Sequence, residues 1–192
     1  MKTLIYGGAF DPPHLAHEHI VRSIAEQYQP ERILIIPSGQ RSDKSYKVAL
    51  EHRVQILSIF AEDLADIGAE LVDDFMVGRV TDGTTLGVDR VMQERYGHSP
   101  TQVFGTDVIP NMKLWDPSGR VEREIPKIFV CRSGAPTPDF SRVDNHHIIT
   151  PELPSDIRAL SSTEIRENVK KNVFHGLAPR IAEYIQKNRL YR

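Results

Sequence analysis

Short apolar segments alternate with segments of helical periodicity along this chain. Residues 3–6 and 32–36 are apolar runs of strand length, and residues 15–28 between them repeat apolar side chains at helical spacing. Such alternation predicts an α/β fold: a doubly wound, Rossmann-like parallel sheet with helices on both faces, which binds ligands beyond the carboxyl ends of its strands. Further strands are expected at 69–72, 102–104, 127–131 and 147–149, and further helices at 50–60, 86–96, 162–171 and 178–188.

The length of the chain, 192 residues, fits one domain. We expect residues 1–192 to form that domain, with residues 155–192 as a small helical C-terminal subdomain. The single cysteine, Cys131, excludes an intrachain disulfide and favours a cytoplasmic location. A net charge of -2 argues against broad binding to nucleic acid or anionic membranes, and no apolar run approaches the ~20 residues of a membrane span. We therefore expect small-molecule partners rather than nucleic acid or a membrane, and the sequence leaves open whether the chain forms a homo-oligomer.

The segment YGGAFDPPHLAH, residues 6–17, follows the first expected strand. Gly7 and Gly8 permit a tight turn there, and their N–H groups, with those of Ala9 and Phe10, are arranged to form an anion-binding nest. The alternative is a plain turn between a strand and a helix.

Two histidines near the end of that segment favour the phosphate interpretation. His14 and His17 are three residues apart, so they share one side of the first helical turn, where the helix N-terminus attracts an anion. Zinc is the alternative ligand for paired histidines. A helical zinc pair is more often four residues apart, and no third ligand lies nearby in the sequence, so we predict no protein-bound metal.

A second phosphate site is predicted at the segment LSSTEIR, residues 160–166. Ser161 or Ser162 can cap the helix that follows, with Glu164 supporting its first turn. Helix capping alone would explain these residues. In the functional interpretation, the hydroxyls and N–H groups of this helix start face an anion, and Arg166 supplies a charged fork for phosphate.

A third segment, FGTD, ends the expected strand at residues 102–104. Gly105 allows close approach of a ligand, and Asp107 can either accept hydrogen bonds from ribose hydroxyls or cap the next helix. Trp115, the only tryptophan, is either part of the core or a platform that stacks on a flat heterocycle.

Taken together, these motifs resemble a known family. GGAFDPPHLAH resembles the G-[ST]-F-D-P-x-H-x-G-H motif of the nucleotidyltransferase superfamily related to class I aminoacyl-tRNA synthetases, and LSSTEIR resembles its I-S-S-T-x-I-R signature. Within that superfamily the chain is similar to the bacterial nicotinate mononucleotide adenylyltransferases. IPSGQ, EHR at residues 51–53, FGTD, Trp115, FVCR at residues 129–132 and the closing GLAPRIAEYIQKNRLY all match in order.

The resemblance implies a single nucleotidyltransferase domain and a set of substrate contacts. It implies catalysis by His14, His17 and Arg166, and transfer of AMP from magnesium-bound ATP to nicotinate mononucleotide, with release of pyrophosphate. Magnesium would be carried by the ATP phosphates. ATP contacts are expected from Gly7, Gly8, Ala9, Phe10, His14, His17, Gly105, Asp107, Ser161, Ser162, Thr163 and Arg166, and acceptor contacts from Lys44, Lys47, Thr85, Trp115 and Arg132.

The chain also departs from the family pattern. Ala16 replaces the glycine between the histidines, which a first helical turn tolerates. The family's S-Y-T-x-D-T-L segment is degraded to GTTLGVD at residues 83–89, where Thr85 matches but Thr84 and Gly87 replace the tyrosine and the acidic residue. The acceptor is therefore open to alternatives such as nicotinamide mononucleotide or phosphopantetheine. Cytidylyl transfer and a nucleotide-sensing module without catalysis are further alternatives.

Overall fold

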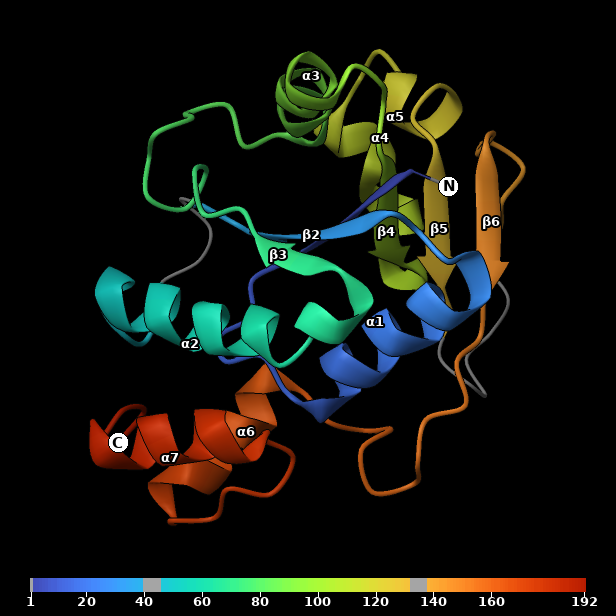
Figure 1. The fold of residues 1–192 in the computed structure, drawn as a ribbon. Helices are drawn as coiled ribbons and strands as arrows, with labels where there is room; N and C mark the ends of the chain where they lie inside the picture. Colours follow the sequence, from blue (N-terminus) through green and yellow to red (C-terminus); the bar gives the residue numbers. More distant parts are fainter. Residues whose placement is uncertain (1, 40–45, 132–137) are drawn as a thin grey trace.

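The fold is built on a parallel sheet (Figure 1). The computed structural model describes residues 2–39, 46–131 and 138–192. Within these residues the sheet has six strands in the order β3-β2-β1-β4-β5-β6, and every neighbouring pair is parallel. The predicted doubly wound α/β fold is confirmed. The strands are β1 (Thr3–Gly8), β2 (Arg32–Pro37), β3 (Ala69–Leu71), β4 (Thr101–Gly105), β5 (Lys127–Val130) and β6 (His146–Ile149).

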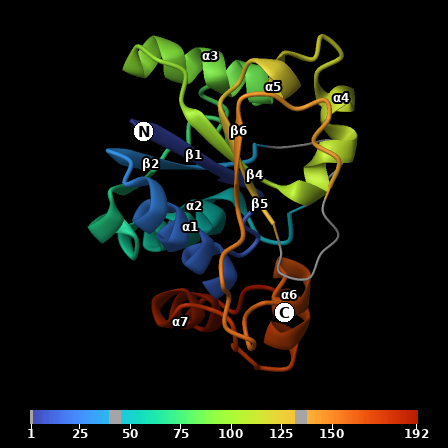
Figure 2. The same ribbon diagram turned by 90° about the vertical axis from the view of Figure 1, so that its right-hand side faces the viewer.

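Helices cover both faces of this sheet, as Figures 1 and 2 show. On one side lie α1 (Leu15–Tyr28) and α2 (Leu50–Glu62), and on the other lie α3 (Thr85–Tyr96), α4 (Met112–Trp115) and α5 (Arg120–Arg123). The chain ends in α6 (Ser162–Lys170) and α7 (Pro179–Lys187), on the α1 and α2 side. None of the helices formed by the described residues is long and apolar enough to span a membrane.

Successive side chains of β1 point to opposite faces of the sheet, and each face has its own hydrophobic cluster. Leu4 and Tyr6 pack in the cluster that contains α1 and α2, whereas Ile5 packs with Met92 of α3 in a second cluster. Leu4 and Met92 are fully buried, and burying one such side chain stabilises the fold by about 1.5–3 kcal/mol. The first strand is therefore held from both sides, which fixes where its carboxyl end lies.

The two C-terminal helices share the larger of these clusters. Ile165 of α6 and Ile181 and Ile185 of α7 are buried in the same cluster as Phe60 of α2. The boundary at residue 155 stays a prediction.

The connection between β4 and β5 holds short helices that the sequence did not reveal. They are a 3-10 helix, η2 (Thr106–Asn111), and the one-turn helices α4 and α5; another 3-10 helix, η1 (Ala65–Ile67), precedes β3. A helix of three to six residues is too short to show a repeated apolar face, so periodicity could not predict these elements.

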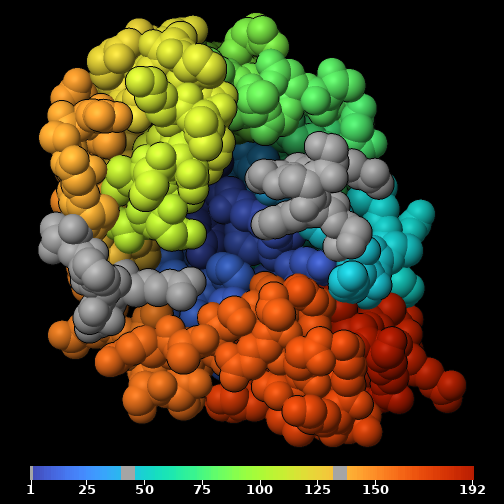
Figure 3. Space-filling model, turned by 180° about the vertical axis from the view of Figure 1, so that it is seen from behind, coloured from blue at the N-terminus to red at the C-terminus, as the bar shows by residue number. Residues whose placement is uncertain are grey.

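The strand order reverses at β1, whose neighbours are β2 on one side and β4 on the other. Figure 3 shows the molecule hollowed on one face, with the N-terminal residues (blue) at the floor of the hollow and C-terminal residues (orange) along its lower edge. Ligands of doubly wound sheets bind at such a reversal, beyond the strand ends. The fold thus places the predicted phosphate motifs where a ligand is expected.

Candidate functional site

The turn after β1 is shaped by Phe10 rather than by the glycines. Gly7 and Gly8 continue the strand, in register with Ile36 and Pro37, so the predicted tight turn at the two glycines is wrong. Phe10 takes the left-handed backbone conformation, with φ 46°. Gly8 is required for another reason: a Cβ there would lie 2.8 Å from Cζ of the Phe10 ring.

The predicted histidine pair stands at the start of α1. His14 is the N-cap and is buried, and its backbone N–H donates to Nδ1 of His17 at 3.2 Å. The centroids of the two rings are 3.7 Å apart and the ring planes are tilted by 30°, while the rings of His17 and Phe10 meet edge to face with centroids 5.2 Å apart. A neutral imidazole that accepts at Nδ1 carries its proton on Nε2, so this tautomer of His17 can offer Nε2–H to an anion.

The second phosphate motif lies directly against the first. In α6, Ser161 caps the helix by accepting from the N–H of Glu164 at 3.2 Å, as predicted. The Ser162 hydroxyl donates to the carbonyl of Pro12 at 2.9 Å. Motifs about 150 residues apart in the sequence therefore meet at one place.

Arg166 also contacts the turn that precedes α1. Its Nη1 donates to the carbonyl of Asp11 at 2.7 Å and its Nη2 to the hydroxyl of Thr163 at 3.1 Å. The guanidinium thus has a fixed position beside the turn, at the N-terminal end of a helix whose dipole favours an anion. The structure brings His14, His17, Ser162, Thr163 and Arg166 together as the sequence predicted.

Three further side chains hold this turn, and the sequence did not predict any of them. Arg53 of α2, only 3% exposed, donates from Nη2 to the carbonyls of Ala9 and Ser38, both at 3.3 Å. Asp11 is 6% exposed, and its Oδ1 accepts from the Tyr191 hydroxyl at 2.9 Å. Arg53 and Tyr191 belong to the EHR and RLY segments, which were noted as similar to the family, but that similarity alone assigned no role to them.

Positive charge exceeds negative charge at the base of this turn. Burial and the neighbouring Asp11 carboxylate raise the pKa of the Tyr191 phenol, while the positive charges of Arg166 and Arg53 oppose that rise. The phenol therefore stays protonated as a donor. Two guanidinium groups against one buried carboxylate leave a surplus of positive charge, which suits an anionic ligand.

The third predicted motif lies at the end of β4, the strand beside β1. Gly105 ends β4 and Asp107 lies in η2, with its carboxylate folded over Gly105 where a Cβ would stand. Asp107 does not cap this 3-10 helix, because the N-cap is Gly105. Asp107 is exposed, and so can reach a ligand at the sheet edge.

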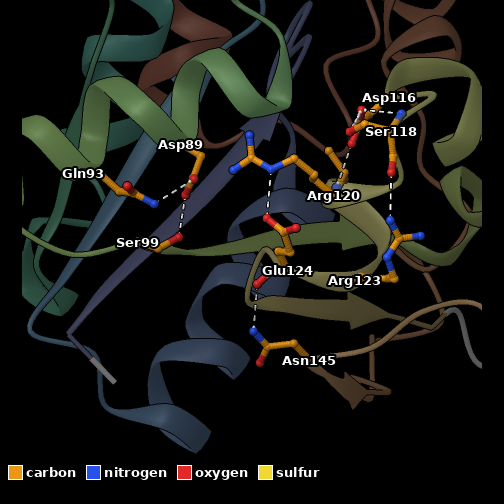
Figure 4. A network of polar contacts seen from close by, with 10 residues as sticks. Asp89, Gln93, Ser99, Asp116, Ser118, Arg120, Arg123, Glu124 and Asn145 are labelled. Carbon is orange, nitrogen blue, oxygen red and sulfur yellow. Dashed lines mark hydrogen bonds and ion pairs between the residues drawn. The ribbon is translucent and has the colours of Figure 1, made fainter.

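Trp115 is on the surface rather than in the core. It ends α4, is 43% exposed, and its ring lies 6.2 Å from that of Phe104. The next residue, Asp116, fixes the chain: its Oδ1 accepts from the N–H of Ser118 at 3.0 Å and its Oδ2 from the N–H of Val121 at 3.0 Å (Figure 4). The hydrogen bond from the Ser118 hydroxyl is the main cause that lowers the pKa of Asp116. An exposed indole that is held in place in this way is suited to stack on a flat ring.

The segment that departs from the family forms the start of α3. Thr84 caps this helix by accepting from the N–H of Gly87 at 3.1 Å, and Thr85 is its first residue, half-buried. A Cβ at Gly87 would overlap the carboxylate and the carbonyl oxygen of Asp82. A side chain therefore does not fit at position 87 in this structure, because Asp82 fills that space.

The remaining predicted acceptor contacts cannot all be placed. Lys44 and Arg132 lie outside the described residues. Lys47 is exposed, and its backbone N–H donates to Oδ2 of Asp11 at 3.4 Å. Among the described residues, no group of three or more histidine, cysteine, aspartate or glutamate side chains could hold a metal ion.

Known proteins are similar to this chain in sequence and in fold. A probable nicotinate-nucleotide adenylyltransferase of Gemmatimonas aurantiaca is 26% identical over 204 residues, covering 100% of this chain and 93% of the relative. One of Acholeplasma laidlawii is 27% identical, covering 98% of this chain and 97% of the relative. The fold is similar to that of Plasmodium falciparum nicotinic acid mononucleotide adenylyltransferase complexed with NaAD, with a TM-score of 0.83 and 23% identity over 100% of this chain and 98% of that one. The resemblance inferred from the motifs is confirmed. Because residues 5–168 also match the family model described as cytidylyltransferase-like, this chain belongs to that family.

Proposed function

We propose that this chain transfers AMP from ATP to nicotinate mononucleotide, releasing pyrophosphate and forming deamido-NAD. One observation carries the proposal: the starts of α1 and α6 meet at a single turn, with Ser162 and Arg166 bonded to that turn beside His14 and His17. The names of the curated relatives support the same activity. The P. falciparum structures, which hold NaAD and APC, show that this fold accommodates dinucleotide and nucleotide ligands in those proteins.

The chemistry needs positioning more than proton transfer. The 5′-phosphate of the acceptor is ionised near pH 7, because the second pKa of a phosphate monoester is about 6. One of its oxygens attacks the α-phosphorus of ATP, a new P–O bond forms, and the bond between the α-phosphorus and the bridging oxygen breaks. The electron pair leaves with pyrophosphate. Catalysis then rests on alignment and on stabilising the charge of the transferring group.

We assign the phosphate contacts by the family resemblance and by the donors that each residue offers. His14 supports the α-phosphoryl group in the transition state, and Nε2–H of His17 faces the β and γ phosphates. The N–H groups of Ser162 and Thr163 at the start of α6, with the Arg166 guanidinium, complete the triphosphate contacts. In this assignment Gly105 and Asp107 contact the ribose or the base of ATP, and Trp115 stacks on the pyridine ring.

Magnesium enters this reaction as part of the substrate. The described residues offer no cluster of ligands for it, so we assign it no protein ligand among them. Magnesium bound to ATP neutralises part of the triphosphate charge. We place the reaction in the cytoplasm, because one cysteine in 192 residues favours a reducing compartment.

A pyrophosphate-release assay tests the function. Purified protein would be mixed with ATP, magnesium and, in separate reactions, nicotinate mononucleotide, nicotinamide mononucleotide or phosphopantetheine. We expect the highest kcat/KM with nicotinate mononucleotide. A preference for another acceptor would refute the assigned substrate while leaving the reaction class intact.

Two arms of the same assay test for cytidylyl transfer and for nucleotide binding without catalysis. Replacing ATP by CTP would reveal a cytidylyltransferase. A nucleotide-sensing module would bind ATP in calorimetry yet release no pyrophosphate with any acceptor, and that result would refute the proposed activity.

A further inference from the structure

The last turn of the chain reaches back to the phosphate site. Beyond α7, Leu190 and Tyr191 are buried, with 8% and 6% of their surfaces exposed. Tyr191 has a left-handed backbone, with φ 61°, which is rare for a bulky residue. Its hydroxyl donates to Oδ1 of Asp11 at 2.9 Å, across 180 residues of sequence.

Asp11 accepts hydrogen bonds from several parts of the chain that surround the site. Its carbonyl accepts from Arg166 at 2.7 Å, and its Oδ2 accepts from the N–H of Lys47 at 3.4 Å. It lies between Phe10, whose ring meets His17, and Pro12, whose carbonyl accepts from Ser162. A shift of the backbone at Asp11 would therefore disturb neighbours on both sides.

Arg166 is a second partner of the Asp11 carboxylate. Nη1 of Arg166 is 3.9 Å from Oδ2 of Asp11, which makes a long ion pair without a hydrogen bond. A carboxylate released by Tyr191 could turn and shorten this contact to a hydrogen-bonded ion pair with the guanidinium. Such a pair would neutralise the charge that a phosphate needs, and it would gain strength because Asp11 is buried.

We propose that Tyr191 is a positioning residue for the phosphate site, which acts by holding the Asp11 carboxylate out of hydrogen-bond distance of the Arg166 guanidinium. The role rests on the proposed function, because it assumes that Arg166 contacts the triphosphate of ATP. The phenol suits this role because burial and the Asp11 charge raise its pKa, so it remains a donor at neutral pH.

The test removes one oxygen atom from each of two tyrosines. Tyr191→Phe loses the bond to Asp11, and Tyr184→Phe in α7 is the matched control, because it loses a bond of 2.9 Å between the hydroxyl and Nδ1 of His52. Each variant would be assayed for pyrophosphate release, for ATP affinity by calorimetry and for thermal unfolding. We expect Tyr191→Phe to raise both KM and Kd for ATP about tenfold, as for loss of one charge-assisted hydrogen bond, with a smaller change in kcat. Tyr184→Phe should leave both constants within twofold of wild type.

A second substitution separates positioning from a merely structural contact. Asp11→Asn removes the carboxylate charge but keeps an oxygen acceptor, so it cannot form the competing ion pair with Arg166. In the Tyr191→Phe background, Asp11→Asn should restore most of the lost ATP affinity. Tyr191→Phe with wild-type ATP affinity, or a double variant that binds ATP no better than Tyr191→Phe, would overturn the proposal.

Failure of the proposed function gives a different pattern. If the wild-type protein binds ATP but releases no pyrophosphate with any acceptor, the adenylyltransferase assignment is wrong, and the calorimetric comparison still decides the role of Tyr191. If the wild-type protein does not bind ATP at all, both proposals fail.

Discussion

Gly8 offers a direct test of how the site is built, through the variant Gly8→Ala. An added Cβ would lie 2.8, 2.9 and 3.1 Å from Cζ, Cε1 and Cε2 of the Phe10 ring. Ordinary contacts begin at 3.4 Å, so the ring must move by about half an ångström. Phe10 is 3% exposed, and its ring contacts Tyr6, His17 and Phe60. The ring therefore cannot move without displacing either the core or His17.

The expected cost follows from this overpacking. Forcing a methyl group into a closed core costs about 1–3 kcal/mol, which for a chain of this size corresponds to a fall in Tm of about 2–12 °C. We expect Gly8→Ala to show that loss and also a reduced kcat, because a displaced Phe10 ring pushes against His17. Thermal unfolding with pyrophosphate release on the same preparation measures both effects.

The adjacent glycine supplies a stability control. A Cβ at Gly7 would lie 3.7 Å from the carbonyl oxygen of Ile36, which is an ordinary contact, so Gly7→Ala should keep the wild-type Tm within about 1–2 °C. The double variant Gly8→Ala with Phe10→Leu checks the mechanism, since a smaller side chain relieves the overlap. Its loss of stability should be smaller than the sum of the two single losses. Equal Tm values for the two alanine variants, or strictly additive losses, would refute the role given to the Phe10 ring.

Three further predictions concern the histidine pair, the arginine and a buried lysine. His17→Ala should lower turnover by about 10²-fold, as for loss of an oxyanion donor, whereas His19→Ala on the same helix should stay near wild type in the pyrophosphate assay. Arg166→Lys keeps the charge but loses the fork to Asp11 and Thr163, so kcat/KM for ATP should fall about tenfold; an unchanged value would contradict the bidentate role. Burial lowers the pKa of Lys127 to about 8 from an ordinary value of 10.5. Between pH 8 and pH 10 the unfolded chain therefore binds more protons than the folded one, and the free energy of unfolding should rise by up to about 1.4 kcal/mol per pH unit. In urea titrations across that range the rise should disappear in Lys127→Met and persist in wild type.

The sequence predicted the long elements and their order because these carry repeated patterns. All six strands and the helices α1, α2, α3, α6 and α7 lie within a few residues of their predicted positions. The helices between β4 and β5 were missed because four residues make barely one turn. Trp115 shows a related limit, because its residue type did not tell a core tryptophan from an exposed one, and only the family resemblance indicated a substrate contact.

The residue types predicted where the phosphate motifs lie, but they did not predict the backbone conformation there. Glycines suggested a turn at Gly7 and Gly8, yet the left-handed residue is Phe10, and Gly8 is required by the packing of a side chain two residues later. At Gly87, where the family pattern has an acidic residue, the carboxylate of Asp82 occupies the space of a side chain. In both places the glycine indicated that something lies close, and only the fold shows what it is.

The position of Asp11 explains why the site draws on the whole length of the chain. The turn that holds it follows β1. Arg53 of α2 donates to this turn at Ala9, and Arg166 of α6 and Tyr191 of the final turn donate to Asp11 itself. None of these contacts is local, so each forms only when the distant element that supplies it has packed into the shared core. A phosphate site made this way is rigid, because moving the turn breaks hydrogen bonds to three distant elements at once. Rigid donors fixed before the substrate arrives are what charge stabilisation requires, since a flexible site would spend binding energy on ordering them. The C-terminal helices thus serve the chemistry through the position of Asp11 as well as through the burial of their own side chains.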